Sequence, residues 1–328
     1  MTCRISASTV LAVALLCAPF AVPEAFAQTK PVPHRQAPAK KPTAKPAPKR
    51  AAAPKPDMLP TQVLLDRAGF STGEIDGAGG ANTDHAIAAF EKEKKTTIAD
   101  ALASAEPATI SYTITAEDEA APRTENIPED MMEKAKLKRL DYSSMVEMLG
   151  ERFHTSPAVL KKLNPTATFA SGEQITVPNV QVVSDAEGKP VPNISITVSK
   201  SQNTLTVTDA SGAVLMFAPV TSGSEHDPLP IGPWTITAVV RNPTFNYNPE
   251  LFWDAEPSHG KAKLPAGPNG PVGVVWIDIS KPHYGIHGTP EPGSVGHTSS
   301  HGCVRLTNWD ALKLAAMVGK GTKVEFVE

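Results

Sequence analysis

The chain has 328 residues, which is enough for two or three modest domains. Its formal net charge of −3 argues against a nucleic-acid-binding protein, because such proteins carry basic surfaces. Hydrophobic residues make up an ordinary 41%, but 32 prolines is a high number and predicts extended segments between folded parts.

Residues 1–27 have the pattern of a secretory signal peptide. Arg4 supplies a positive charge, and residues 10–17 form an apolar core that is too short to span a bilayer. The sequence Ala25-Phe26-Ala27 is a small-x-small cleavage site. We therefore expect a secreted protein without a transmembrane segment after cleavage; an uncleaved anchor is the alternative.

Residues 28–57 are rich in proline, alanine and lysine, with eight basic residues against the single acid Asp57. Such a composition cannot form a core and predicts a disordered linker. Its positive charge could attract anionic polymers or a membrane surface, but a solvated spacer is the simpler interpretation.

Residues 58–104 have the pattern of a small helical domain. A first helix is expected to end at Gly69, a turn follows over 73–77, and Asn82 or Thr83 could cap a second helix. This order resembles the three-helix peptidoglycan-binding domain. The matching segments are Gln62-Val63-Leu64-Leu65, Gly69-Phe70, Ile75-Asp76-Gly77, Asn82-Thr83 and Ala86-Ile87-Ala88-Ala89-Phe90. A module that serves only for packing or spacing is the alternative.

Residues 105–140 are an uncertain linker, in which only 110–114 alternates like a strand. Residues 141–180 predict two helices, an Asn-Pro pair and a short strand over 174–177. This order resembles a LysM glycan-binding module that lacks its opening strand. A helical linker domain is the alternative.

Residues 190–328 predict a mostly β domain with one clear helix near its end. Thr307 or Asn308 can cap that helix, and Gly319 or Gly321 can end it. The predicted strands are 194–198, 205–208, 214–220, 234–239, 272–279 and 323–327.

Cys303 would be the only cysteine left after signal cleavage, and a single thiol in an oxidising compartment is a candidate nucleophile. His287 lies 16 positions before it and can meet it only across a strand or loop return. An imidazole can either lower the pKa of such a thiol or take its proton during attack. Gly302 allows a close backbone approach to the thiol.

The segments His287-Gly288-Thr289 and Ser300-His301-Gly302-Cys303, followed by Arg305 and Asn308, resemble the catalytic motif of the YkuD-like L,D-transpeptidases. The resemblance covers nearly all of residues 190–328. It implies a β-sandwich-like fold with one helix after the active site.

The resemblance also implies the roles of the site residues. Cys303 would be the nucleophile and His287 the general base and later acid. Gly288 would orient His287 through its carbonyl oxygen, and the N–H groups of Gly302 and Cys303 would form an oxyanion hole. The expected substrate-binding residues are Arg305, His301, Ser300, Thr289 and Asn308. For Arg305, a salt bridge that holds the loop is an equally open alternative.

The family's reaction is attack on the L-centre carbonyl of a tetrapeptide stem, release of D-alanine, and transfer of the acyl group to an amine. The acceptor stays open among a second stem, water, a free D-amino acid and an envelope protein. A cysteine peptidase and a catalytically silent wall-binding protein are the alternative functions. We expect no cofactor, no metal, peptidoglycan as the partner, and a periplasmic or cell-envelope location. The histidines near Cys303 match no common zinc spacing.

Overall fold

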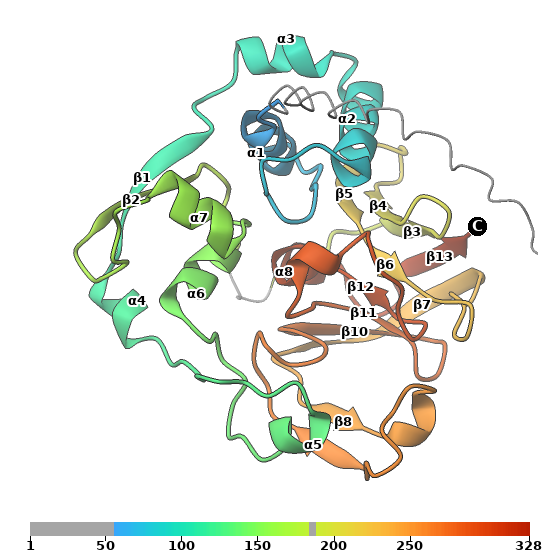
Figure 1. The fold of residues 1–328 in the computed structure, drawn as a ribbon. Helices are drawn as coiled ribbons and strands as arrows, with labels where there is room; N and C mark the ends of the chain where they lie inside the picture. The colour runs from blue at the N-terminus through green and yellow to red at the C-terminus, as the bar shows by residue number, and fades with distance from the viewer. Residues whose placement is uncertain (1–55, 184–187) are drawn as a thin grey trace, which may run out of the picture. The chain divides into compact units, whose positions relative to one another are not determined.

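A computed structural model describes residues 56–183 and 188–328 (Figure 1). The predicted signal peptide and nearly all of the predicted linker lie outside these residues. Across the two described ranges, no helix has both the length and the apolar character that a bilayer span requires.

Three helices, α1 (Leu59–Arg67), α2 (Ala81–Lys94) and α3 (Ile98–Ala103), follow one another at the start of the described chain. Gly69, at a φ of 86°, stands just beyond α1, as predicted. The predicted cap of α2 is wrong, because α2 starts after Gly80 and makes no side-chain cap. Asn82 instead donates to the carbonyl oxygen of Val295, which is 2.9 Å away in the C-terminal region, residues 190–328.

The next segment contains β1 (Thr109–Thr113), α4 (Ala116–Ala120), α5 (Met131–Lys134), α6 (Met145–Arg152), α7 (Pro157–Leu163) and β2 (Gln174–Pro178). β1, which lies within one residue of the strand pattern predicted over 110–114, pairs antiparallel with β2. The sequence did not predict this pairing. The strand lies more than thirty residues upstream of α6, beyond the range in which a local pattern shows pairing. Ser144 and Ser156 cap α6 and α7 through their side chains.

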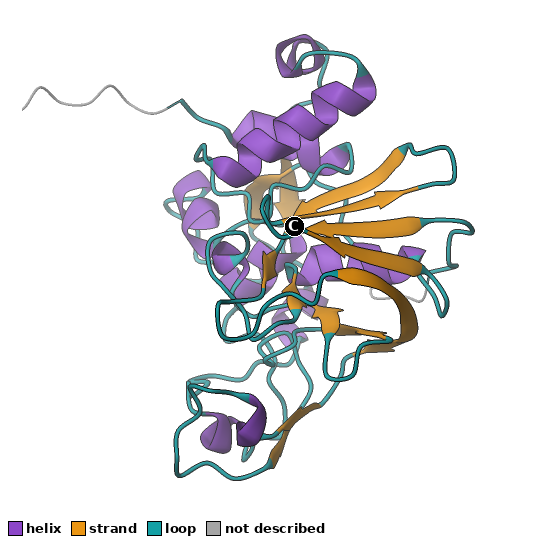
Figure 2. Cartoon of the chain, turned by 90° about the vertical axis from the view of Figure 1, so that its right-hand side faces the viewer, coloured by secondary structure: helices purple, strands orange, loops and turns teal. Residues whose placement is uncertain are grey.

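The C-terminal region, residues 190–328, is built on one nine-stranded sheet with the order β5-β4-β3-β13-β7-β10-β11-β12-β6. Figure 2 shows most helices of the described chain to one side of these strands. Its strands are β3 (Ser195–Ser199), β4 (Thr204–Thr208), β5 (Val214–Pro219), β6 (Thr221–Ser222), β7 (Gly232–Arg241), β10 (Val275–Ile279), β11 (Gly285–His287), β12 (Val304–Arg305) and β13 (Lys323–Val327).

The long strand β7 joins the two halves of this sheet. Its first residues, 232–235, pair with β13, and its later residues, 236–241, pair with β10. The strands on both sides of β7 are therefore hydrogen-bonded into a single sheet. The helix that follows the site is α8 (Asn308–Met317), and the Thr307 side chain caps it by accepting from the N–H of Asp310.

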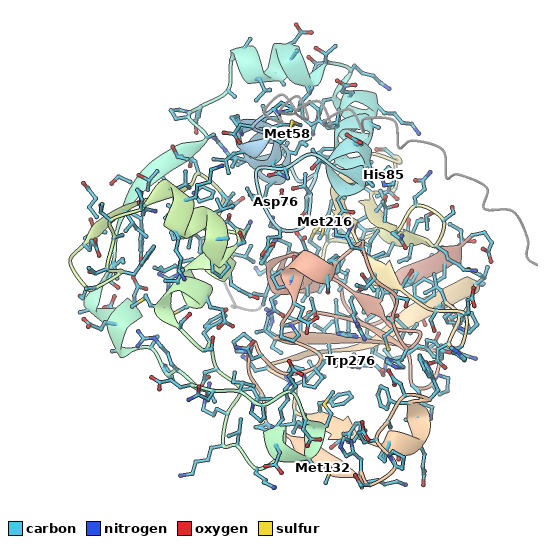
Figure 3. The ribbon with its side chains drawn as sticks, viewed as in Figure 1. Met58, Asp76, His85, Met132, Met216 and Trp276 are labelled. Atoms are coloured by element: carbon cyan, nitrogen blue, oxygen red, sulfur yellow. The ribbon has the colours of Figure 1, made fainter. Side chains whose placement is uncertain are left out.

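A small two-stranded sheet, β8 (Phe245–Tyr247) with β9 (Ala262–Leu264), projects from the C-terminal region. The short 3-10 helix η1 (Pro249–Leu251) lies between the two strands, and a second one, η2 (Pro292–Ser294), follows β11. α5 covers the small sheet, and its Met132 packs on the apolar cluster of Leu140, Tyr247 and Leu264 (Figure 3).

The helical N-terminal segment covers the edge of the large sheet. β5 is an edge strand, and Phe217 exchanges backbone hydrogen bonds with Gly69 and Ser71 at 2.9 and 2.8 Å. The ring of Phe70 stacks on that of Phe217. An unpaired edge strand invites aggregation, so these contacts also protect it.

A buried charged cluster joins α1, the end of α6 and α8. The Asp66 carboxylate lies 3.0 Å from Nδ1 of His154 and 3.0 Å from Nζ of Lys313. Burial alone would raise the pKa of Asp66, but the charges of His154 and Lys313 hold it well below its ordinary value. The cluster therefore contains a buried ion pair between Asp66 and Lys313, with the His154 ring in contact with the same carboxylate.

Candidate active site

Two neighbouring parallel strands bring the cysteine and the histidine together. β11 and β12 pair in register, with Ile286 opposite Val304 and His287 opposite Arg305. Cys303 directly precedes β12 and stands two residues before Arg305, which places the side chains of both on the same face as His287. The 16-residue spacing in the sequence is thus the length of the loop that joins two adjacent strands.

His287 is buried, with 4% of its surface exposed, and its ring stacks on Trp276 of β10 at 5.4 Å (Figure 3 labels Trp276). Its Nδ1 lies 2.7 Å from the carbonyl oxygen of Gly288. A carbonyl oxygen can only accept, so Nδ1 carries the proton and Nε2 keeps a free lone pair. Burial lowers the pKa of His287 to about 4, and the charge of Arg305 acts in the same direction. The imidazole is therefore neutral at pH 7.

Cys303 is a free, half-buried thiol whose Sγ lies 3.8 Å from the carbonyl oxygen of His283. Burial raises the pKa of Cys303 to about 11, although the N–H of Gly285 and the charge of Arg305 both favour the thiolate. The thiol is thus protonated at neutral pH. Of the two ways in which an imidazole activates a thiol, this geometry favours proton transfer during attack over a standing ion pair.

Gly302 has a φ of 97°, and a Cβ at this position would lie 2.5 Å from Cε1 of Tyr284. Only glycine can therefore form this turn directly before the thiol. In the part of the chain that the structure describes, the N–H groups of Gly302 and Cys303 donate to no protein acceptor. Ser300 is buried and fixes the turn, because its hydroxyl donates to the carbonyl oxygen of Cys303 at 2.6 Å and accepts from the N–H of Gly223 at 2.7 Å.

Arg305 is half-buried on the same face as the thiol. Among residues 56–183 and 188–328, no carboxylate lies within ion-pair distance of its guanidinium group, so the alternative of a loop salt bridge finds no partner here. Burial lowers the pKa of Arg305, whereas Cys303, Glu291 and Asp254 favour its charged form. Its guanidinium group is available to a ligand.

The other predicted substrate-binding residues occupy different environments. Thr289 is buried and accepts a hydrogen bond from the N–H of Glu291 at 3.3 Å. Asn308 is only 1% exposed and bonds within the protein. His301 is more open, and its Nε2 lies 2.8 Å from the carboxylate of Asp254.

Several residues near the site have no signal in the sequence. The rings of Phe252 and Trp253 contact His301, and His226 stacks on Trp253 at 4.4 Å. Trp253 is 60% exposed, which is unusual for a tryptophan and places an aromatic surface beside the motif. These residues come from loops far from Cys303 in the chain, so local spacing could not show them.

A family model for the L,D-transpeptidase catalytic domain (YkuD) matches residues 193–326. The "Putative L,D-transpeptidase YkuD" of Bacillus subtilis is 32% identical over 177 residues, which cover 52% of this chain and 87% of that protein. The "Probable L,D-transpeptidase YbiS" of Escherichia coli is 43% identical over 67 residues, but the match spans only 22% of its length and 20% of this chain.

Among solved structures, L,D-transpeptidase 3 from Mycobacterium tuberculosis in complex with a faropenem-derived adduct has a TM-score of 0.36 at 19% identity. The match covers 48% of this chain and 75% of that one. Family membership rests on the sequence matches, above all on the Bacillus subtilis protein, most of whose length aligns with this chain. The chain belongs to the YkuD family of L,D-transpeptidases.

Proposed function

We propose that the protein is a peptidoglycan L,D-transpeptidase that works through a Cys303 thioester. In this proposal the donor is a tetrapeptide stem, and the acyl group passes from the stem to Cys303 and then to an amine. The observation that carries the proposal is the pairing of β11 with β12. It sets a neutral imidazole with a free Nε2, a lone thiol and an unpaired guanidinium group on one face.

In the acylation step, Arg305 binds the carboxylate of the terminal D-alanine, since a guanidinium group matches a carboxylate in geometry and charge. Nε2 of His287 takes the Cys303 proton while the sulfur attacks the L-centre carbonyl carbon. The N–H groups of Gly302 and Cys303 face the oxygen that becomes negative. The C–N bond then breaks, and the imidazolium returns its proton to the leaving D-alanine amine.

The deacylation step reverses these roles. The amine of an acceptor attacks the thioester carbonyl, Nε2 of His287 removes a proton from that amine, and the Cys303 thiolate leaves and is reprotonated. The low pKa of His287 suits this cycle, because a histidine that stayed charged at neutral pH could not accept either proton. An amino group on a second stem gives a 3→3 crosslink, and one on an envelope protein gives attachment.

The competing outcomes share the same thioester. Attack by water would make the protein an L,D-carboxypeptidase, and a thioester formed at an internal peptide bond would make it a cysteine peptidase. The half-open thiol and the unpaired Arg305 speak for catalysis over a silent binding role. The helical segments 58–104 and 141–180 would help to retain the enzyme at the wall of the cell envelope.

Product analysis tests the proposal. The protein is incubated with a disaccharide-tetrapeptide, and the reaction is followed by mass spectrometry. We expect free D-alanine together with a dimer joined through the third residues. Free D-alanine with only tripeptide product identifies the carboxypeptidase, and cleavage at an internal bond identifies the peptidase. Neither product, with a stem that stays intact, contradicts the proposal.

A further inference from the structure

Asn308 occupies a tight slot directly beneath the loop that orients His287. Its Oδ1 accepts from the N–H of Val274 at 3.2 Å. A Cβ on Gly288 would lie 2.2 Å from this Oδ1, and a Cβ on Gly273 would lie 2.0 Å from it. Glycine is therefore required at both positions, because any side chain there would clash with Oδ1 of Asn308. The Gly288 peptide, whose carbonyl oxygen holds Nδ1 of His287, rests against the Asn308 amide.

The position of the Asn308 amide depends on a residue from outside the catalytic region. Nδ2 of Asn308 donates to Oε1 of Glu151 at 3.0 Å and to the carbonyl oxygen of Pro268 at 3.3 Å. Glu151 is the seventh residue of α6, in the segment that resembles a LysM module. The amide is thus held at both ends, by Glu151 on one side and by the Val274 N–H on the other.

The surroundings of Glu151 favour its neutral form. Burial, together with the neighbouring Glu147 and Glu74, raises the pKa of Glu151 to about 8, although the hydrogen bonds from Asn308 and Tyr142 act in the opposite direction. A neutral carboxyl group accepts from Asn308 through its carbonyl oxygen. A glutamine has the same oxygen in the same place, so Glu151→Gln preserves this contact whereas Glu151→Ala removes it.

We propose that Glu151 and Asn308 are positioning residues for His287, and that α6 supports the site through them. Glu151 fixes the Asn308 amide, the amide supports the Gly288 peptide, and the Gly288 carbonyl oxygen keeps the proton on Nδ1 of His287. This inference rests on the proposed role of His287 as the base. It assigns a catalytic purpose to a segment that lies outside the matched family domain.

Asp66 of α1 offers a matched control, because its contacts also join α8 to the end of α6. Asp66 bonds to Lys313 of α8 and to His154, which follows α6, so Asp66→Asn weakens the same packing without touching Gly288. A loss caused only by loosened packing would appear in Asp66→Asn as well as in Glu151→Ala.

The experiment measures the single-turnover acylation rate constant of the whole chain with a disaccharide-tetrapeptide, together with the donor concentration at half-saturation. We expect Asn308→Ala to lower the rate constant about a hundredfold, since a small misplacement of a catalytic group has this effect. Glu151→Ala should lower it about tenfold, as expected for a lost buried hydrogen bond. Glu151→Gln and Asp66→Asn should stay within about twofold of the unchanged protein, and half-saturation should not change.

A second readout needs no substrate. Nitrogen-15 NMR of labelled histidines reports which ring nitrogen carries the proton, and the spectrum of His287→Gln identifies the signal of His287 among the nine histidines. We expect a single Nδ1-protonated tautomer in the unchanged protein, in Glu151→Gln and in Asp66→Asn. Glu151→Ala and Asn308→Ala should show a mixture of tautomers.

Two results would overturn the proposal. One is a Glu151→Ala protein whose rate constant and tautomer match those of Asp66→Asn, which leaves Glu151 a purely structural role. The other is a Glu151→Gln protein that loses as much as Glu151→Ala. If Asn308→Ala does not fold, the two Glu151 variants still test the positioning role. If the unchanged protein is not acylated, the proposed function fails, while the tautomer readout still decides the positioning role.

Discussion

The catalytic region, residues 193–326, and the N-terminal region, residues 58–180, differ in how far apart along the chain their decisive contacts lie. The chemistry that we propose for the first depends on residues 287–305, whose ends meet across two adjacent strands. The structural cluster of the second joins Asp66 to His154 and to Lys313, which are 88 and 247 positions away. A short motif therefore determines the site, whereas only the folded chain shows what the N-terminal region holds together.

This difference predicts a separation of effects. Substitutions on the β11–β12 face should change chemistry with little change in stability. Substitutions in the buried cluster around Asp66 should change stability with little change in chemistry. The Glu151–Asn308 contact is the place where the two regions meet at the chemistry, and the variants described above test it.

The largest effect should come from His287→Gln. The variant removes the imidazole that we propose as the general base for Cys303, and we expect the acylation rate constant to fall about a thousandfold, within the usual range for a lost general base. Alkylation of the thiol by iodoacetamide above pH 11 should be unaffected, because hydroxide rather than His287 then forms the thiolate. An unchanged acylation rate constant would show that another residue acts as the base.

The next largest effect is expected in the buried cluster. Asp66→Asn removes the nearer carboxylate partner of Lys313 and leaves it only Asp310, 3.8 Å away. We expect a loss of about 3 kcal/mol in the free energy of unfolding, measured with urea. The pKa of Asp66 in the folded protein lies below its ordinary value, so its contribution is complete above about pH 4 and is lost as the pH falls further.

The variant should therefore show a weaker dependence of stability on pH between about pH 4 and pH 2 than the unchanged protein. Its acylation rate constant should stay the same. Equal unfolding free energies for the two proteins would show that desolvation cancels the ion pairs.

Arg305→Gln should have a smaller effect, and on binding more than on stability. We expect the donor concentration at half-saturation to rise about tenfold, because one charge-assisted contact to the D-alanine carboxylate is lost. Arg305 also favours the thiolate, so the pKa of Cys303 should rise above about 11 in the variant. The pH dependence of alkylation measures this shift. An unchanged donor concentration at half-saturation would show that Arg305 does not bind the donor.

The smallest effect should come from the surface ion pair between Arg67 and Glu106. The Glu106 side chain is 69% exposed, so water and salt screen the pair. We expect Glu106→Gln to change the free energy of unfolding by less than about 0.5 kcal/mol, as measured by urea unfolding. A decrease in the free energy of unfolding as large as that of Asp66→Asn would show that this surface ion pair stabilises the helical segment as strongly as the buried cluster does.

Local signals were enough for much of the catalytic region. Alternating residues predicted β3, β4 and β13 nearly to the residue, and Thr307 was among the expected caps of α8. The motif also located the segments that β11 and β12 bring together. These features depend on neighbours within a few positions, for which side-chain periodicity and capping chemistry are informative.

The features that the sequence did not predict depend on partners that lie far away along the chain. The strand β1 was predicted, but its pairing with β2 was not, and Asn82 bonds to Val295 instead of capping α2. Asn308 was expected at the substrate but is buried, since Glu151 and two glycines enclose it. The motif marked Asn308 as notable, but only the packing around it shows what its amide contacts.

The central claim is that a stem peptide becomes covalently attached to Cys303, and the intact mass of the protein tests it most directly. The protein and its Cys303→Ala variant are each incubated with a disaccharide-tetrapeptide and weighed. We predict an added mass equal to the stem minus D-alanine in the unchanged protein and none in the variant. An unmodified protein whose thiol still reacts with iodoacetamide would contradict the claim.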